Sequence, residues 1–526
     1  MLTVRTPSGR WQRLSEQIEA FLAQDIISLQ IDGKQVRGFR SPDSPSLWIR
    51  DHSDMLRGGI YFEPDVFSAI EAFAEHQSAN GRIFDFVMVQ PLRHSPEKEN
   101  WERWVRVPVE ADVEFRFIKA AFLSWRASGE HARLHALLPA LERALLYATS
   151  HPLRWDDHLG LVKRPYTIDT WDFDYTAGRH DWLNFQITEH TYWGIFHGDN
   201  SGIYEAAGLL ATLLEHAGEQ HKADTWRGFA SDLRQRANAL LFNGRFYRHF
   251  HKITPLTIAG VNEEQQLSLS TPMAINRGLA THDIAVAILN EYRTRGEQTS
   301  AFAEWFGIDP PFPDGIFGDE KLIGGAYING GIFPLCGGEL ARAAFEHGFE
   351  SYGLAILRQY SDMIAASNAS YLWYFPDGTP ASEEASTSPE AQPTDGWGSS
   401  AMLYAFIEGL CGIVDRSHSF QNVCLSPRWA ATDETCAEID LSYAASGAGF
   451  GYTLHHDRDR LRINIELRAQ QTRLDLRLLL PEQTKTATLK WNGRSMRTTR
   501  EVVRTSTYIC CSGLVEKGAE IEVCYE

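Results

Sequence analysis

The chain has 526 residues, of which 43% are hydrophobic, a share that is normal for a globular protein and too high for a disordered one. Its 50 lysine and arginine residues face 68 aspartate and glutamate residues, giving a net charge of −18. A nucleic-acid partner is not expected, because phosphate binding needs a basic patch. No run of about 18 apolar residues occurs, so no membrane span is expected.

The N-terminal residues lack an apolar stretch after a basic one, so no secretory signal is expected and the predicted location is cytoplasmic. The seven cysteines are odd in number and have no Cys-x-x-Cys spacing, which favours reduced thiols. No histidine-rich segment accompanies them, and we therefore expect no zinc and no other metal site. The sequence does not indicate an oligomeric state.

Three domains are predicted along the chain. Residues 1–45 are expected to form a helix and short strands near Ile27 and Val36, packed on the next domain. Residues 46–424 repeat apolar side chains at the i, i+3, i+4, i+7 spacing of amphipathic helices. Short links between several of them favour antiparallel helix pairs. The expected helices are Leu14–Ala23, Pro64–Ser78, Asp112–Ala127, Ala132–Thr149, Ser201–Ala217, Lys222–Leu241, His282–Arg293, Gly331–His347, Ser351–Ala366 and Gly398–Ile413.

Residues 425–526 follow the pattern of strands. Leu461–Leu467 and Leu474–Leu480 alternate apolar and polar side chains with period two, and Asn492-Gly493 is typical of a tight hairpin turn. This domain is predicted to be an antiparallel β-sandwich. The fold class is therefore mainly α, with helix pairs followed by a β domain.

Five loops rich in aromatic and polar residues interrupt the predicted helices, and loops of this kind commonly carry function. The first contains Trp48, Arg50 and Asp51. An indole can cover one face of a sugar ring while a carboxylate accepts hydrogen bonds from two hydroxyls. A buried Arg50–Asp51 pair that pins the loop is an equally weighted alternative.

Two further loops precede predicted helices. Glu110, Asp112 and Glu114 are interpreted first as carboxylates that favour the positive N-terminal end of a helix. Tyr327 and Asn329 lie among paired glycines, which permit close approach of the backbone. The simplest role for Asn329 is that of a helix N-cap.

The loop at residues 167–175 is the strongest candidate for catalysis. Asp169, Asp172 and Asp174 alternate there with Trp171 and Phe173. An aromatic environment disfavours the charged form of a carboxyl and raises its pKa. A carboxylic acid that stays protonated near neutral pH can act as a general acid. An acidic calcium-binding loop is the alternative, but such loops have few bulky aromatic residues.

The last loop begins near Trp373, carries Glu383, Glu384 and Glu390, and ends at Trp397 in a Gly-Trp-Gly segment. We interpret it as a lid over a cleft, with a flexible excursion as the alternative. No serine nucleophile elbow, His-Glu-x-x-His motif or phosphate-binding loop occurs. Two carboxyls across a cleft are the usual equipment for cleaving a glycosidic bond.

Several of these segments resemble motifs of the six-hairpin glycosidases, namely the trehalase, mannosyl-oligosaccharide glucosidase and glucoamylase-like group. Trp171-Asp172-Phe173 is similar to the Gly-Trp-Asp-Phe segment of trehalases, whose aspartate is the general acid. The segment that starts at Asn329, Asn-Gly-Gly-Ile-Phe-Pro, resembles an Asn-Gly-Gly-Val-Trp-Pro segment of six-hairpin enzymes. Where trehalases continue with Ser-Ser-Arg-Trp, this chain has Asp174-Tyr175, so the sugar specificity does not carry over.

Two other segments extend the resemblance. Gly-Trp397-Gly resembles the signature of the last hairpin, and Trp48-Ile-Arg50-Asp51 is similar to the substrate-clamping Trp-Arg-Asp of exo-acting members. The resemblance implies an (α/α)6 toroid barrel and an exo-acting, inverting glycoside hydrolase that needs no cofactor.

In this family the acid is paired with a carboxylate base, which implies that Asp172 protonates the leaving oxygen while Glu384 or, second, Glu390 activates water. An oligosaccharide or small glycoside is the implied substrate. A sugar phosphorylase, isomerase or lyase on the same barrel, or a non-catalytic carbohydrate-binding protein, is the alternative. The expected substrate-binding residues are Trp48, Arg50, Asp51, Trp171, Tyr327, Asn329, Trp373 and Trp397.

Overall fold

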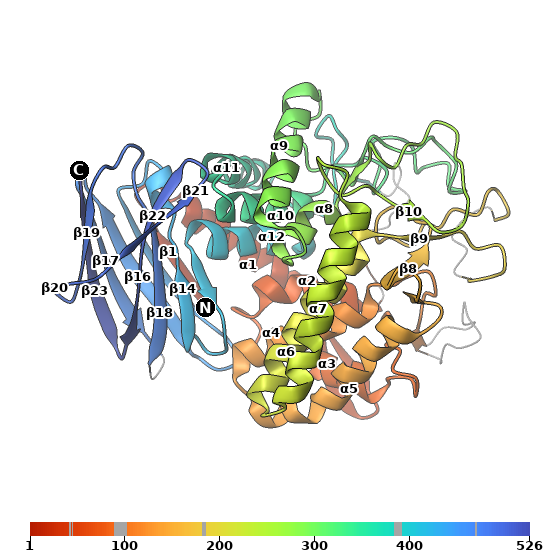
Figure 1. Ribbon diagram of the computed structural model, residues 1–526, viewed down its shortest axis with the longest axis horizontal. Coiled ribbons are helices and arrows are strands. Elements are labelled where there is room, and N and C mark those ends of the chain that lie inside the picture. Colours follow the sequence, from red (N-terminus) through yellow and green to blue (C-terminus); the bar gives the residue numbers. More distant parts are fainter. Residues whose placement is uncertain (42–43, 45, 89–102, 181–185, 383–391, 469–470) are drawn as a thin grey trace.

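The computed structural model describes residues 1–41, 44, 46–88, 103–180, 186–382, 392–468 and 471–526. Long helices occur only before residue 411, and the described chain after it forms strands with one short 3₁₀ turn (Figure 1). None of the described helices is long and apolar enough to cross a membrane. The helices are α1 (Arg10–Gln24), α2 (Ile49–Gly59), α3 (Ser68–Glu75), α4 (Val113–Ser128), α5 (His131–Ser150), α6 (His197–His216), α7 (Gln220–Leu241), α8 (Ser270–Asn276), α9 (His282–Gln298), α10 (Pro334–Glu346), α11 (Glu350–Ser367) and α12 (Gly396–Tyr404), with a π-helical turn over Ala405–Leu410.

Six of these helices form a closed ring of neighbours, in which every second helix of the chain takes part. Helix α2 contacts α4, α4 contacts α6, and the contacts continue through α8 and α10 to α12, which contacts α2 again. Helices α5, α7, α9 and α11 each contact the ring helix that precedes them. Only Gly129 and Glu130 separate α4 from α5, so these two run antiparallel.

The apolar spacing of the sequence does not predict two of the ring helices, α2 and α8. All residues of α2 are buried, including the charged Arg50, Asp51, Asp54 and Arg57. Because no face of α2 meets solvent, its sequence has no polar stripe to set against an apolar one. Helix α8 has only seven residues, too few for a periodic pattern.

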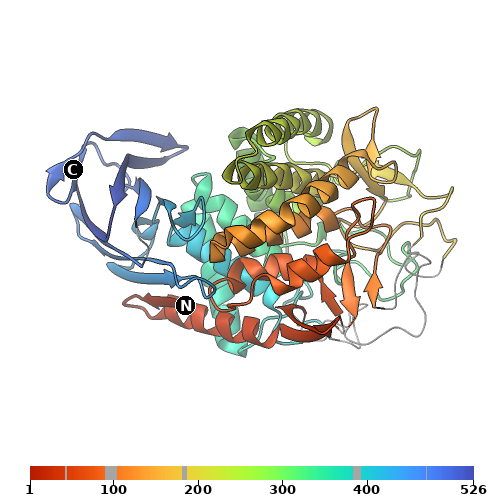
Figure 2. The same cartoon turned by 90° about the horizontal axis from the view of Figure 1, so that it is seen from below.

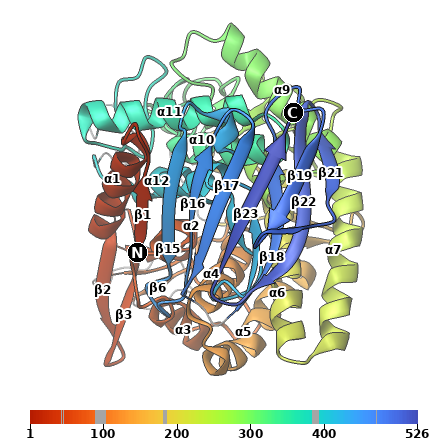
Figure 3. The same cartoon turned by 90° about the vertical axis from the view of Figure 1, so that its left-hand side faces the viewer.

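Two large sheets lie as layers beside the helices (Figures 2 and 3). A Cβ added at Gly513 on one sheet would lie 2.8 Å from the Trp491 ring on the other, so their inner faces are in contact. The seven-stranded sheet has the order β1 (Leu2–Arg5), β15 (Cys436–Ser442), β16 (Gly449–His456), β17 (Arg460–Leu467), β23 (Gly518–Tyr525), β19 (Ala487–Trp491), β20 (Arg494–Ser495). The five-stranded sheet has the order β13 (Ile413–Asp415), β14 (Asn422–Leu425), β18 (Thr472–Leu479), β22 (Ser506–Val515), β21 (Thr499–Val503).

The β region differs from the prediction in two ways. Strand β14 pairs with β18 in parallel, so the sandwich is not antiparallel throughout. Strand β1, from the predicted N-terminal domain, pairs with β15 and thereby joins the seven-stranded sheet. The domain boundaries stay a prediction, and β13 and β14 of the five-stranded sheet both precede residue 426.

Strands in the segments between the helices form smaller sheets. Strands β8 to β10 lie on the side of the helices opposite the large sheets (Figure 1). The pairs and sheets are β2 (Ile26–Ile31) with β3 (Lys34–Phe39); β4 (Ser46–Trp48), β5 (Phe86–Met88) and β6 (Trp104–Val105); β10 (His251–Lys252), β9 (Trp193–Ile195), β8 (Leu161–Pro165) and β7 (Trp155–Asp156); and β11 (Leu267–Ser268) with β12 (Ile308–Asp309).

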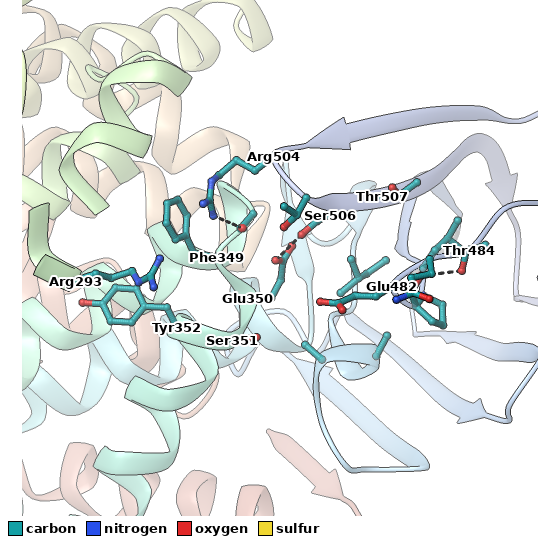
Figure 4. A pocket seen from close by; sticks show the side chains of 18 residues that line it. Arg293, Phe349, Glu350, Ser351, Tyr352, Glu482, Thr484, Arg504, Ser506 and Thr507 are labelled. Atoms are coloured by element: carbon teal, nitrogen blue, oxygen red, sulfur yellow. Dashed lines mark hydrogen bonds between the residues drawn. The ribbon is translucent and has the colours of Figure 1, made fainter. Parts of the chain in front are cut away.

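The hairpin of β21 and β22 docks on the start of α11 along a polar groove (Figure 4). Arg504 donates a hydrogen bond to the Gly348 carbonyl at 2.9 Å and covers the Phe349 ring. Ser506 and Tyr508 both donate to the Glu350 carboxylate. These contacts join the five-stranded sheet to the start of α11.

Candidate active site

Hydrogen bonds to the start of α8 and to neighbouring segments hold the loop at residues 166–175 in place. Asp169 accepts hydrogen bonds from the backbone N–H of Ser270 at 2.9 Å and from its hydroxyl at 2.5 Å, at the start of α8. The backbone N–H of Asp169 donates to Nε2 of His249, and Arg164 donates to the Trp171 carbonyl. Asp169 has a φ of +48°, a left-handed conformation that its hydrogen bonds maintain.

Asp172 is half-buried in this loop, between two aromatic side chains that are almost fully buried. Burial raises the pKa of its carboxyl, against the opposing influence of the Arg50 and Arg164 guanidinium groups. Among the described residues, no other side chain forms a hydrogen bond with this carboxyl. A carboxyl that keeps its proton and is still partly open to solvent can donate that proton to a substrate.

Aromatic rings surround the same loop. Trp171 stacks on Trp397, with ring centroids 5.7 Å apart and an interplanar angle of 21°. Tyr327 meets Trp171 and Phe173 edge-on, at 5.9 and 6.0 Å. Trp373 lies behind Tyr327 at 6.1 Å and is fully buried. The structure thus brings four of the predicted substrate-binding residues together beside Asp172.

Arg50 lies over Trp171, with its guanidinium 5.9 Å from the ring centroid. It forms ion pairs with Glu110 and, at 3.0 Å, with Asp112. Burial raises the pKa of Glu110, and the neighbouring Asp85, Asp112 and Asp172 raise it further, against the effect of Arg50. One oxygen of Glu110 is buried without a hydrogen-bond partner among the described residues.

A second buried network supports the aromatic rings from the helix side. The indole N–H of Trp397 donates to Asp54 at 2.8 Å, and Arg116 pairs with the same carboxylate at 2.5 Å. Arg57 pairs with Glu339 of α10. The ring helices α2, α4, α10 and α12 are therefore linked by charged groups close to the stacked tryptophans.

Three predicted substrate-binding residues have contacts of a different kind. Trp48 is half-buried against Phe86, and Asp51 is buried beside Ser41. Asn329 is fully buried, and its amide exchanges hydrogen bonds with the backbone of Phe312 at 2.7 and 3.1 Å, which fixes the loop. A sugar contact for these three stays a prediction.

Two alternatives from the sequence are wrong. Arg50 pairs with Glu110 and Asp112, and not with Asp51. Asn329 does not cap α10, whose N-cap is Phe333. The predicted bases Glu384 and Glu390 lie outside the described residues, so their place relative to Asp172 stays a prediction.

Sequence reasoning missed the roles of Glu110, Asp112 and Asp54. Asp112 occupies the N-cap position of α4, but its side chain makes no capping hydrogen bond and pairs with Arg50 and Arg116 instead. No local signal marks these roles, because charged residues on every side of a segment such as Ile49–Gly59 more often indicate an exposed helix than a buried one.

No protein-family model matches the sequence, and a search of curated proteins finds no relative. Similar folds occur among solved structures. The α-L-rhamnosidase of Dictyoglumus thermophilum is 10% identical with a TM-score of 0.60, covering 99% of this chain and 50% of its own. The GH78 rhamnosidase of a Bacillus species is 16% identical with a TM-score of 0.59, covering 91% and 43%.

A third structure matches over nearly its whole length. The GH63 mannosylglycerate hydrolase of Thermus thermophilus is 12% identical with a TM-score of 0.51, covering 75% of this chain and 99% of its own. The chain spans half or less of the length of the two rhamnosidases. At these identities the likeness establishes the fold, which is one shared with (α/α)6-barrel glycosidases, as the sequence motifs predicted.

Proposed function

We propose that the protein is an exo-acting, inverting glycoside hydrolase with Asp172 as its general acid. The observation that carries the proposal is a half-buried carboxyl of raised pKa beside stacked tryptophans. It lies in a fold shared with glycoside hydrolases. Asp172 protonates the glycosidic oxygen as the bond to the anomeric carbon breaks, and the buried aromatic rings form the wall behind the sugar site.

The finer architecture belongs to the same proposal. The closed ring of α2, α4, α6, α8, α10 and α12 forms the inner layer of an (α/α)6 barrel, α3, α5, α7, α9 and α11 belong to its outer layer, and α1 of the N-terminal domain packs against α11 and α12. The barrel occupies residues 46–424, with the β-sandwich following it. A cytoplasmic location is part of the proposal as well.

The second half of the mechanism is the base. A glutamate on the 383–390 loop, Glu384 first and Glu390 second, activates the water. In an inverting enzyme the two carboxyls lie about 6.5–9.5 Å apart, which leaves room for that water, against about 5–5.5 Å in a retaining enzyme. Proton NMR of the first sugar released tests this, and release with the anomeric configuration of the substrate contradicts inversion.

The acid is tested by Asp172→Asn, which keeps the shape of the side chain and removes its proton. We expect kcat on an unactivated glycoside to fall by about 10²- to 10⁴-fold, with an unchanged unfolding temperature. Asp169→Asn is the matched variant, because Asp169 binds Ser270 and fixes the loop, so it is expected to lower the unfolding temperature. Activity of Asp172→Asn within a few-fold of the unmodified protein rejects the assignment.

The pH dependence of kcat/KM gives a second test. A general acid must be protonated, so activity falls as pH rises through the pKa of Asp172. Burial raises that pKa, which moves the fall to a higher pH than an ordinary aspartate would give. An aryl glycoside with an acidic leaving group needs no proton, and with it we expect the fall to disappear.

The substrate is sought by a screen. Aryl glycosides of L-rhamnose, D-mannose and D-glucose, and mannosylglycerate, represent the activities named for the similar structures. A requirement for phosphate in turnover would favour a sugar phosphorylase. Calorimetric binding of oligosaccharides without turnover would favour a carbohydrate-binding protein.

A further inference from the structure

Three histidines meet where the helices join the β-sandwich. His131 is the first residue of α5, His216 is the last residue of α6, and His418 lies in the segment between β13 and β14. One ring nitrogen from each lies within 4.8 Å of the others. His131 and His216 are exposed, and His418 is buried, so the group opens to solvent on one side.

The three imidazoles gather around one indole. Ring centroids of His131 and His216 are 4.4 Å apart, and that of His418 is 4.8 Å from His131. The Trp125 ring lies 5.0 Å from His216 and 4.8 Å from His418, and its N–H donates to Nδ1 of His131 at 3.1 Å. Nε2 of His216 lies 2.8 Å from the same Nδ1.

A second observation points to an absent ligand. His418 is only 7% exposed, and its buried Nδ1 has no hydrogen-bond partner among the described residues. An unsatisfied buried polar atom is costly and calls for an explanation. His216 also ends α6, where the carbonyls of the last turn favour a cation.

We propose that His131, His216 and His418 bind one divalent transition metal of the zinc class. Neutral imidazole nitrogens suit zinc, copper and nickel, and three protein ligands leave one position for water. In a tetrahedral site with metal–nitrogen distances of about 2.0–2.1 Å, the ligand nitrogens lie about 3.3 Å apart. At Nδ1 of His131 the metal takes the place of the hydrogen bond from Trp125, and the two exposed side chains adjust to reach that spacing. No local spacing in the sequence reveals the group, because its members come from residues 131, 216 and 418.

The site is separate from the candidate active site. Helix α4 starts at the Asp112 end and has 16 residues, so its far end, next to His131, lies about 24 Å away. The bound metal ties α5 and α6 to the segment that enters β14. That segment is also held by the backbone N–H of Ser419, which donates to the Arg126 carbonyl at 2.9 Å.

The test uses the full chain, stripped with a chelator and titrated with ZnCl₂ by calorimetry. We expect one tight site per chain and a higher unfolding temperature with zinc. Cobalt in place of zinc is expected to give the visible absorption of a tetrahedral site.

Single histidine variants test which residues bind the metal. His131→Gln and His216→Gln change exposed side chains and leave folding intact, and each is expected to weaken zinc binding by about tenfold or more. His282→Gln is the control, because among the described histidines His282 contacts one, His347, at 2.9 Å. Absence of saturable binding overturns the proposal, and so does equal affinity in His216→Gln and the unmodified chain. Equal weakening by His282→Gln overturns it too, since zinc would then bind surface histidines generally.

Discussion

The inner faces of the two large sheets and the surroundings of Asp172 are both buried, but different side chains fill them. In the sheets, Ile463, Ile465, Leu474 and Leu476 point inward, and their polar neighbours along each strand point out. Around Asp172 the buried side chains include the charged groups Arg50, Asp54, Glu110, Asp112 and Arg116.

The two kinds of buried side chain contribute differently to the stability of the fold. Apolar side chains stabilise the folded chain in proportion to the area they remove from water. Buried ion pairs give little or no net gain over apolar side chains of the same volume, because each charge loses its hydration. Charged groups concentrated where the ring helices begin are therefore better explained by a functional site than by stability.

The largest effect is expected where a buried charge loses its partner. Arg50→Met keeps much of the volume and leaves Asp112 and Glu110 facing each other. Breaking such a pair costs about 3–5 kcal/mol of unfolding free energy. Arg50 lowers the pKa of both carboxyls, so its loss lets both pKa values rise, and the cost shrinks as pH falls and the carboxyls take up protons. Denaturant unfolding at two pH values measures this, and a cost under about 1 kcal/mol at neutral pH contradicts the ion-pair network.

A cavity in the sheets is expected to cost somewhat less and to leave catalysis alone. Leu476→Ala on β18 removes buried methyl groups and costs about 2–5 kcal/mol. At a temperature where the variant stays folded, kcat and KM are expected to match those of the unmodified protein. A changed KM in a folded sample would show that the sandwich and the site are coupled.

The two regions also differ in how well the sequence predicts them. Strands β17 and β18 alternate buried and exposed residues, and period-two patterns predict them because one face meets water. The amphipathic helices, such as α7, are predicted for the same reason. Helix α2 is buried on all sides, so its sequence gives no periodic signal. The parallel pairing of β14 with β18 depends on contacts about 50 residues apart, which local patterns do not contain.

The candidate site was predicted in part. Trp171 and Asp172 were singled out because carboxylates alternate with aromatic residues in their loop, Tyr327 because of the paired glycines around it, and Trp397 because of its Gly-Trp-Gly segment. The structure places the three aromatic rings in contact, and their roles toward a sugar stay predictions. Glu110 and Asp112 were assigned to a helix end, since a carboxylate before a helix has that role more often. Only the tertiary position of Arg50 shows that they are its partners.

A smaller effect is expected from removing the hydrogen bond between the Trp397 indole and Asp54. Trp397→Phe keeps an aromatic ring on Trp171 and removes the N–H that donates to Asp54. Arg116 still pairs with Asp54, so the expected cost is about 1–3 kcal/mol. We expect KM for the sugar to rise more than kcat falls. Trp491→Phe on β19 is the control, with no expected change in KM.

The smallest effect is expected at an exposed ion pair, where the arginine-to-methionine change proposed for Arg50 is repeated at Arg5. Arg5 on β1 pairs with Glu438 on β15 at 2.6 Å, as Arg50 pairs with its carboxylates, but 65% of the Arg5 side chain and 44% of the Glu438 side chain are exposed. Water already solvates both charges, so Arg5→Met is expected to cost about 0.2–1 kcal/mol. The cost should vanish as salt is added, because an exposed pair is screened, whereas that of Arg50→Met should persist. Equal costs for the two variants would mean that burial does not set the strength of these ion pairs. The charged groups around Asp172 would then not differ in energy from exposed ion pairs.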